Sequence, residues 1–170
     1  MNIAFVGNFA SKKGSIIFKD LVLELKNKYK WYIFGYTGDT KSYDKIKKYI
    51  KISQSYENGQ LPQLLTKYNI DLCLILSIWP ETYSKTFFEV LDTNTPIIAF
   101  KSVGFPEYIF KEYPLFIENN IKSIDDAISM VKEKPDEIKK IISKFNKKNQ
   151  SIFKEKKQIK IKIIDNLLLR

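Results

Sequence analysis

Short apolar segments alternate with amphipathic helical patterns along most of this chain, and this alternation constrains the fold more than any other feature. Residues 70–76, IDLCLIL, are almost continuously apolar, which is typical of a strand buried on both faces of a parallel sheet. In residues 11–30 the apolar side chains recur at spacings of three and four, which is typical of a helix packed on a sheet. The sequence therefore predicts an α/β protein with a doubly wound parallel sheet.

The expected elements follow the same alternation along the chain. Strands are expected within residues 1–7, 31–39, 50–53, 70–76, 96–100 and 114–118. Helices are expected within residues 11–30, 41–49, 58–69 and 82–92, then from a cap at Ser123, and finally from Pro135 onward. Ligands of such sheets bind beyond the carboxyl ends of the strands, so the loops that follow the strands should hold the site.

The length of 170 residues is that of one domain. We divide the chain into a ligand-binding domain over residues 1–134 and a basic C-terminal helical extension over residues 135–170. Ile138, Ile141, Ile142 and Phe145 recur at helical spacing, so the first part of the extension should pack on the domain.

The composition argues against several kinds of site. Histidine is absent and Cys73 is the one cysteine, so a histidine-assisted nucleophile is excluded and a zinc site is not expected. No Asp-x-Asp pair occurs that could hold Mg²⁺ for a nucleotide substrate. The N-terminus lacks a signal-peptide pattern, and the longest apolar run, residues 72–76, is far shorter than the ~18 residues of a membrane span. These features predict a cytoplasmic protein without a bound metal.

The net charge of +10 is concentrated near the C-terminus. Residues 132–162 contain 12 lysines and 4 acidic residues, a balance of +8, which leaves +2 for residues 1–131. A near-neutral body, with few aromatic residues in the basic part, argues against nucleic-acid binding. The basic extension is either an ordinary solvated helix or a surface for an anionic partner or membrane.

The segment GNFASKKG, residues 7–14, ends the first expected strand and opens the first expected helix. Backbone N–H groups at a helix N-terminus, with Lys13 beside them, suit a phosphate group. The segment has neither Walker A nor G-x-G-x-x-G spacing, and many ordinary strand–helix turns look the same. It is therefore either a phosphate loop or a turn without a ligand.

Two glutamates, Glu81 and Glu89, are separated by seven residues around the expected helix 82–92, which Thr82 or Ser84 can cap. Eight helical residues rise ~12 Å, which is too far for a glycosidase pair of carboxyl groups at ~5–9.5 Å. The two carboxylates could instead hold separate parts of a long ligand. The simpler alternative is that Glu81 complements the helix dipole and that Glu89 is a solvated surface residue.

These two motifs, together with residues 61–100, resemble the donor-binding half of retaining glycosyltransferases of family 4. The stretch WPETYS, residues 79–84, is similar to that of bacterial polysaccharide rhamnosyltransferase-like members. Glu81 and Glu89 match the Glu-x7-Glu motif of the family, and residues 7–14 match its phosphate loop. The resemblance covers residues 3–130 or so and implies a Rossmann-like domain that is a single half of a two-domain GT-B fold.

The resemblance implies a role for each matching residue. Glu81 and Lys13 would be catalytic, with Glu81 at the donor sugar and Lys13 at the phosphate charge of the leaving nucleotide. Glu89 would bind the ribose hydroxyls, and Tyr56 would lie near the base. The other donor-binding residues would be Gly7, Asn8, Gly14, Tyr83, Ser84 and Thr86. Members are generally metal-independent, so no metal or other cofactor is expected beside the nucleotide-sugar substrate.

The implied function is that of a nucleotide-sugar donor-binding domain in the synthesis of bacterial surface polysaccharide or glycoconjugate. The acceptor would lie on an N-terminal domain or a partner chain, so the isolated chain is expected to transfer no sugar. The family often has arginine where this chain has Asn8, which favours the alternative of a non-catalytic nucleotide-binding or interaction module. The tail, residues 150–170, carries apolar groups among lysines and is expected to contact the missing domain, a second copy or the inner membrane face.

Overall fold

The core of the fold is an open sheet of six parallel strands in the computed structural model, which describes residues 1–79, 84–101, 113–148 and 150. The spatial order is β3-β2-β1-β4-β5-β6. The strands are β1 (Asn2–Val6), β2 (Lys30–Phe34), β3 (Ile50–Gln54), β4 (Leu72–Ile75), β5 (Ile97–Phe100) and β6 (Phe116–Ile117). The predicted doubly wound parallel sheet is confirmed.

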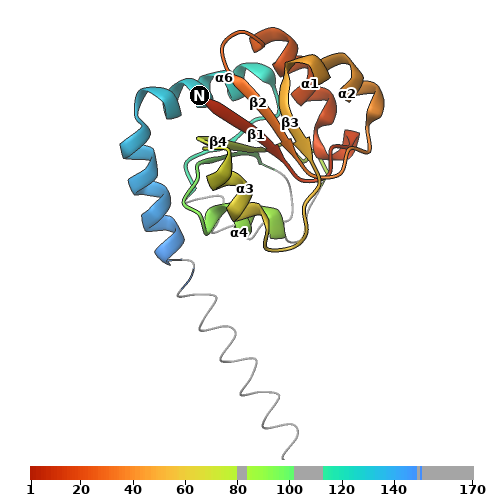
Figure 1. Cartoon of the computed structure of the whole chain (residues 1–170). Helices are drawn as coiled ribbons and strands as arrows, with labels where there is room; N and C mark the ends of the chain where they lie inside the picture. Colours follow the sequence, from red (N-terminus) through yellow and green to blue (C-terminus); the bar gives the residue numbers. More distant parts are fainter. Residues whose placement is uncertain (80–83, 102–112, 149, 151–170) are drawn as a thin grey trace, which may run out of the picture.

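Helices cover both faces of this sheet. They are α1 (Ser15–Leu25), α2 (Thr40–Ile46), α3 (Leu61–Lys67), α4 (Lys85–Leu91) and α6 (Ile121–Glu133), with 3-10 turns η1 (Ser11–Lys13) and η2 (Lys47–Tyr49). Helices α1, α2 and α6 lie on one side of the sheet, and α3 and α4 lie on the other (Figure 1). A further helical segment, residues 135–148, follows α6.

The direction of the chain through the sheet changes between β1 and β4. From β1 the chain adds β2 and β3 on one side, and from β4 it adds β5 and β6 on the other. In the register, Ile3 pairs with Trp31 and Leu72, so the strands end at the same edge. In open α/β sheets ligands bind outside the carboxyl ends of the strands at such a point. The fold therefore places the candidate site in the crevice between the loops that follow β1 and β4.

The helix caps agree with the sequence at one position and differ at another. Ser84 caps α4, since its hydroxyl accepts a hydrogen bond from the Phe87 N–H at 3.3 Å. The expected cap at Ser123 is wrong. Asn120 caps α6 instead, and its side-chain oxygen accepts from the Ser123 N–H at 2.8 Å. Asparagine is among the strongest N-cap residues, and it starts the helix three positions before Ser123.

The helical segment 135–148 packs on the sheet domain through one face. Ile138, Ile142 and Phe145 are buried, and the Asn146 side chain donates to the Leu91 carbonyl at 2.9 Å. Ile141 was expected on the same face, but 38% of it is exposed. Ile142 points into the core, and Ile141, which lies about 100° further around the helix, points partly to solvent. The division of the chain at residue 134 stays a prediction.

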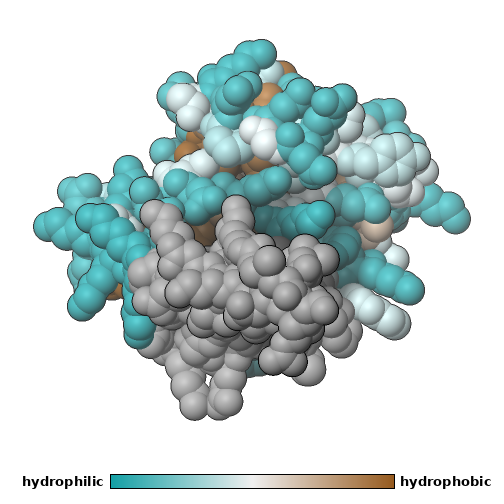
Figure 2. All heavy atoms as spheres, turned by 90° about the horizontal axis from the view of Figure 1, so that it is seen from below, coloured by the Kyte–Doolittle hydropathy of each residue, from teal (hydrophilic) through white to brown (hydrophobic). Residues whose placement is uncertain are grey.

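The surface of the described residues is mainly hydrophilic on the face shown in Figure 2, where hydrophobic side chains are scattered. None of the described helices is long and apolar enough to cross a membrane. The thiol of Cys73 is fully buried in β4, as expected for a core residue, and burial raises its pKa.

Candidate donor-binding site

The loop after β1 is held by the loop after β2. The Phe9 N–H donates to the Tyr36 carbonyl at 2.8 Å. The Phe9 carbonyl in turn accepts from the N–H groups of Gly38 and Asp39, at 3.0 and 2.7 Å. Phe9 itself is fully buried and its ring meets that of Phe5 edge to face, with the centroids 5.2 Å apart. These contacts fix the path of the predicted phosphate loop before any ligand arrives.

Two glycines allow the backbone segments at this edge to approach one another. Gly14 has φ = 90°, and a Cβ atom there would collide with the carbonyl oxygen of Leu76, just after β4. Gly35 has φ = 147°, and a Cβ atom there would collide with the carbonyl oxygen of Gly7. Only glycine fits such positions without strain. Of the two glycines predicted at the phosphate loop, Gly14 is therefore required by the packing of the loop as well, whereas a Cβ atom at Gly7 would meet no atom within 4 Å.

Helix α1 begins at the end of this loop without a side-chain cap. Its N-cap is Gly14, which has no side chain that could accept from the backbone N–H groups of the first turn. The positive end of the helix dipole and the N–H groups of the first turn thus face the carboxyl edge of the sheet. An anion at this position would be stabilised by both.

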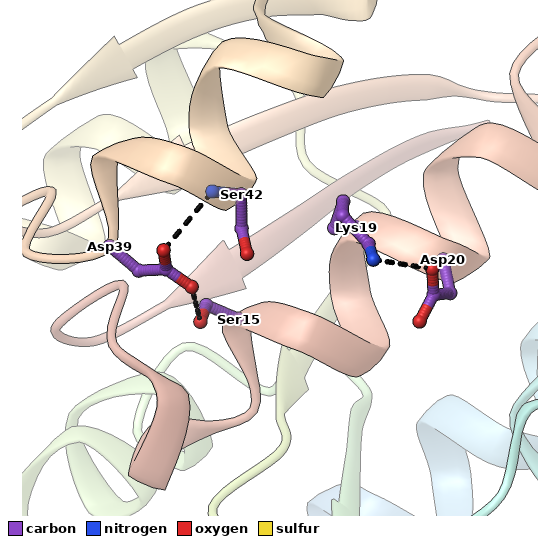
Figure 3. Close-up of polar contacts among 5 residues, drawn as sticks. All are labelled: Ser15, Lys19, Asp20, Asp39 and Ser42. Atoms are coloured by element: carbon purple, nitrogen blue, oxygen red, sulfur yellow. Dashed lines mark hydrogen bonds and ion pairs between the residues drawn. The ribbon is translucent and has the colours of Figure 1, made fainter.

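Asp39 ties the starts of α1 and α2 together (Figure 3). Its carboxylate accepts from the Ser15 hydroxyl at 2.6 Å and from the Ser42 N–H at 3.0 Å. These hydrogen bonds, that of the Ser15 side chain first, hold the pKa of Asp39 below its usual value. Sequence reasoning missed Asp39. Its available signal was an aspartate directly before a helical pattern, which is a strong N-cap position.

A small cavity at the crevice brings together five of the residues predicted to bind the donor. It lies between the loops after β1 and β4 and the first turn of α4. Its predicted members are Gly7, Asn8, Lys13, Ser84 and Thr86, and it is completed by Val6, Ile75, Leu76 and Ser77. Gly14 lies next to it, against Leu76. Backbone N–H groups, one amide, three hydroxyls and one ammonium in this arrangement suit a phosphate group.

Tyr56, Thr86 and Glu89 form a second group beside this cavity, on α4 and the loop after β3. All three side chains are half-buried. Burial raises the pKa of the Tyr56 hydroxyl, a hydrogen bond with the Thr86 side chain lowers it, and the charge of Glu89 raises it. The charge of Glu89 thus acts on the Tyr56 hydroxyl, although the two residues are far apart in the sequence. Such a pair can recognise hydroxyl groups of a sugar.

Two of the predicted site residues, Glu81 and Tyr83, lie outside the described residues. In the described ranges, no group of three or more His, Cys, Asp or Glu side chains is placed to hold a metal ion.

Larger hollows occur at the opposite edge of the sheet and along α6. Volumes of about 180 and 420 Å³ lie between the sheet and the helical segment 135–148, and both are lined by Asp71, Pro96 and Lys139. Another of about 510 Å³ lies at Lys28 and Lys132. None of these hollows contains a residue predicted to bind the donor. We therefore locate the site by its chemistry and by the topology of the sheet rather than by volume.

Comparison with known families identifies the class of this protein. A sequence model of the family described as glycosyl transferases group 1 matches residues 2–158. The match covers most of the chain, which therefore belongs to the glycosyl transferases group 1 family. A comparison with curated protein sequences finds no match.

Solved structures of glycosyltransferases share the fold. The C-terminal domain of the glycosyl transferase group 1 family protein LpcC from Francisella tularensis has 18% identity and a TM-score of 0.64, over 83% of this chain and 80% of that one. The catalytic domain of cholesterol-α-glucosyltransferase from Helicobacter pylori has 16% identity and a TM-score of 0.67, over 89% and 99%. Anabaena Alr3699/HepE, solved in complex with UDP-glucose, has 17% identity and a TM-score of 0.68.

The last match covers 84% of this chain but only 42% of the Anabaena chain. At these identities the likeness shows the fold alone, which is that of a Rossmann-like half of a GT-B glycosyltransferase.

Proposed function

We propose that this domain binds the nucleoside diphosphate part of a nucleotide-sugar donor in the crevice between β1 and β4. The observation that carries this proposal is the cavity lined by Gly7, Asn8, Lys13, Ser84 and Thr86 at the point where the strand order reverses. Family membership supports it, as do the solved relatives with UDP and UDP-glucose.

The proposed donor lies across the crevice in a fixed order. Glu89 binds the ribose hydroxyls, and Tyr56 lies beside the ribose and the base. The diphosphate lies against Gly7, Asn8 and Gly14, where the α1 N-terminus and Lys13 offset its charge. Ser84 and Thr86 border the diphosphate from α4.

The proposed reaction is that of a retaining glycosyltransferase of family 4. The bond between the sugar C1 and the diphosphate oxygen breaks, and the acceptor oxygen bonds to C1 on the same face. The acceptor proton goes to the leaving phosphate. This domain contributes binding and charge stabilisation at the leaving group, with Lys13 as its cation and Glu81 at the sugar. No metal takes part in this scheme.

The acceptor is bound elsewhere in this proposal, on an N-terminal domain or a partner chain. We propose a role in the synthesis of bacterial surface polysaccharide or glycoconjugate, in the cytoplasm or at the inner face of the membrane. The 170-residue chain by itself is expected to bind donor without transferring sugar. Asn8 supplies no charge at a position where the family often has arginine, which favours a non-catalytic nucleotide-binding module as the second candidate.

Calorimetric titration with UDP, GDP and dTDP, each compared with its nucleoside, tests the proposal. We expect saturable binding of at least one diphosphate and no binding of the matching nucleoside at the same concentration, because the phosphate loop supplies most of the contacts. Absence of binding by all three diphosphates would contradict the proposed function.

A further inference from the structure

Trp79 lies exposed at the edge of the proposed donor site, and the functional assignment above gives it no role. It directly follows Ile78 in the loop after β4, and Ser77 of the same loop lines the cavity. The chain has two tryptophans. Trp31 is fully buried in the core, whereas 57% of Trp79 is exposed. An exposed indole beside a binding cavity presents a large, flat surface that the packing of the core does not use.

The backbone at Trp79 is held in place by hydrogen bonds. The Ser77 hydroxyl donates to the Trp79 carbonyl at 3.2 Å, and the Ile78 N–H donates to the Lys12 carbonyl at 3.1 Å. The first bond lies within the loop after β4, and the second joins this loop to the segment between β1 and α1. The ring is therefore presented from a fixed backbone.

The ring itself is oriented by a cation. The ammonium of Lys12 lies 4.3 Å from the centroid of the Trp79 ring, within the range of a cation–π interaction. Such a contact favours this orientation of the ring and places a positive charge over one of its faces. An aromatic face beside a polar, charged group is suited to a ligand that is both amphipathic and hydroxylated.

The Trp79 ring and the residues proposed to bind the nucleoside lie at different parts of the site. Trp79 contacts the loop between β1 and α1, whereas Tyr56, Thr86 and Glu89 lie together at α4. Helices α1 and α4 lie on opposite sides of the sheet (Figure 1). A donor with its ribose at Glu89 and its diphosphate in the cavity would direct its sugar end away from Tyr56.

We propose that Trp79, oriented by Lys12, is the stacking surface of a sugar subsite that takes a pyranose ring. A pyranose carries C–H groups on its faces and hydroxyl groups around its edge, so one of its faces can stack on the indole face opposite Lys12 while its edge meets water. The inference rests on the proposed function for the location of the nucleotide. The ring can belong to the donor itself or to an acceptor glycan, and the experiment separates these two sources.

The fluorescence of Trp79 gives a direct readout, because subtracting the spectrum of Trp79→Phe removes the contribution of the buried Trp31. The probes are UDP, UDP-glucose, maltotriose and trigalacturonate, each titrated into the full chain with acrylamide as quencher. We expect UDP to leave the Trp79 signal unchanged, and a sugar-containing probe to shift it to shorter wavelength and to protect it from acrylamide. A response to UDP-glucose alone assigns the subsite to the donor sugar, and a response to either glycan alone assigns it to the acceptor.

Variants test the contribution of the ring to affinity. In Trp79→Ala, the affinity for the responding sugar-containing probe should fall about twofold to tenfold, while that for UDP stays within error. Trp79→Tyr should restore most of the loss. Tyr49→Ala, which removes an aromatic ring of η2 that also has lysine ammonium groups over it, serves as the matched control and should bind like the parent.

Three results would overturn the inference. One is a Trp79 signal that ignores every sugar-containing probe, and another is an equal response to UDP and UDP-glucose, which would indicate stacking of the base. The third is a Trp79 signal that changes with the concentration of protein and not with that of ligand, which would make Trp79 part of a protein interface. Loss of UDP binding in calorimetry, by contrast, would count against the proposed function and leave a glycan response at Trp79 standing.

Discussion

At the scale of single residues, Asp39 stabilises the backbone around the site, a role that the sequence analysis did not predict. It accepts from the Ser15 hydroxyl and the Ser42 N–H and so links the N-termini of α1 and α2. Asp39→Ala should lower the free energy of unfolding by ~1 kcal/mol, the usual cost of losing an N-cap. Urea unfolding measures this loss of free energy, with Asp44→Ala on the same helix as control. Asp44 forms only an exposed ion pair with Lys47, so its loss should change stability little.

The contribution of Asp39 should also depend on pH. The folded-state pKa of Asp39 is lowered, so its stabilising effect is fully present above the unfolded carboxyl pKa of ~3.9. It is lost as the pH falls through the lower, folded-state value. The difference in unfolding free energy between the parent and Asp39→Ala should thus shrink in acid. A difference that grew on acidification would contradict this account of the cap.

Gly14 is the residue at which the phosphate loop tolerates least change. Gly14→Ala meets both a positive φ and a collision with the Leu76 carbonyl oxygen. Gly59→Ala has a similar φ of +85° but no atom within 4 Å of the new Cβ. We expect Gly59→Ala to cost ~1–2 kcal/mol of unfolding free energy, from backbone conformation alone, and Gly14→Ala to cost clearly more. If Gly14→Ala and Gly59→Ala lost the same unfolding free energy, measured by thermal and urea unfolding, the loop would move away from Leu76 at no cost.

At the scale of elements, the helical segment 135–148 offers a matched pair of neighbouring isoleucines. Ile142 is fully buried against the domain, whereas Ile141 is partly exposed. Ile142→Ala should lower the unfolding free energy by ~2–5 kcal/mol, because it leaves a cavity in a packed core. Ile141→Ala should cost less than ~1 kcal/mol. Similar small losses for both variants would mean that the segment does not pack on the domain in solution.

Sequence reasoning was most successful for elements whose pattern is set by burial. The continuous apolar run in β4 and the spaced apolar residues of α1 predicted a parallel sheet, because each pattern allows few other environments. It failed at Asn120, which caps α6 three residues before the expected cap. It also failed at Ile141, which lies about 100° around the helix from the buried Ile142. For the site, the strand ends predicted Gly7 and Asn8 and the start of α1 predicted Lys13, whereas Ser84 and Thr86 were implied by the family resemblance. The contacts of Asp39 with Ser15 and of Lys12 with Trp79 depend on loop geometry, which no spacing encodes.

At the scale of the whole molecule, we predict a partner for the basic extension. Lys139, Lys140, Lys144 and Lys147 are exposed in its described part, and the tail of residues 150–170 adds further lysines among apolar side chains. We expect the full chain to self-associate or to bind vesicles that contain anionic phospholipid, and salt to weaken the vesicle binding. A chain truncated after residue 149 should do neither and should still bind nucleoside diphosphate.

Light scattering and vesicle co-sedimentation of the two chains across a salt series measure this. A full-length chain that stays monomeric and ignores anionic vesicles at low salt would show that the extension is only a solvated helix.

The central claim is that the crevice between β1 and β4 binds a nucleoside diphosphate whose ribose is held at α4. Calorimetric titration of Glu89→Ala tests it most directly, with Asp92→Ala at the end of the same helix as control. The account predicts that Glu89→Ala weakens binding by ~1.5–3 kcal/mol, the range for a hydrogen bond to a charged group, while Asp92→Ala binds like the parent. Identical titration curves for Glu89→Ala and the parent chain would contradict the account.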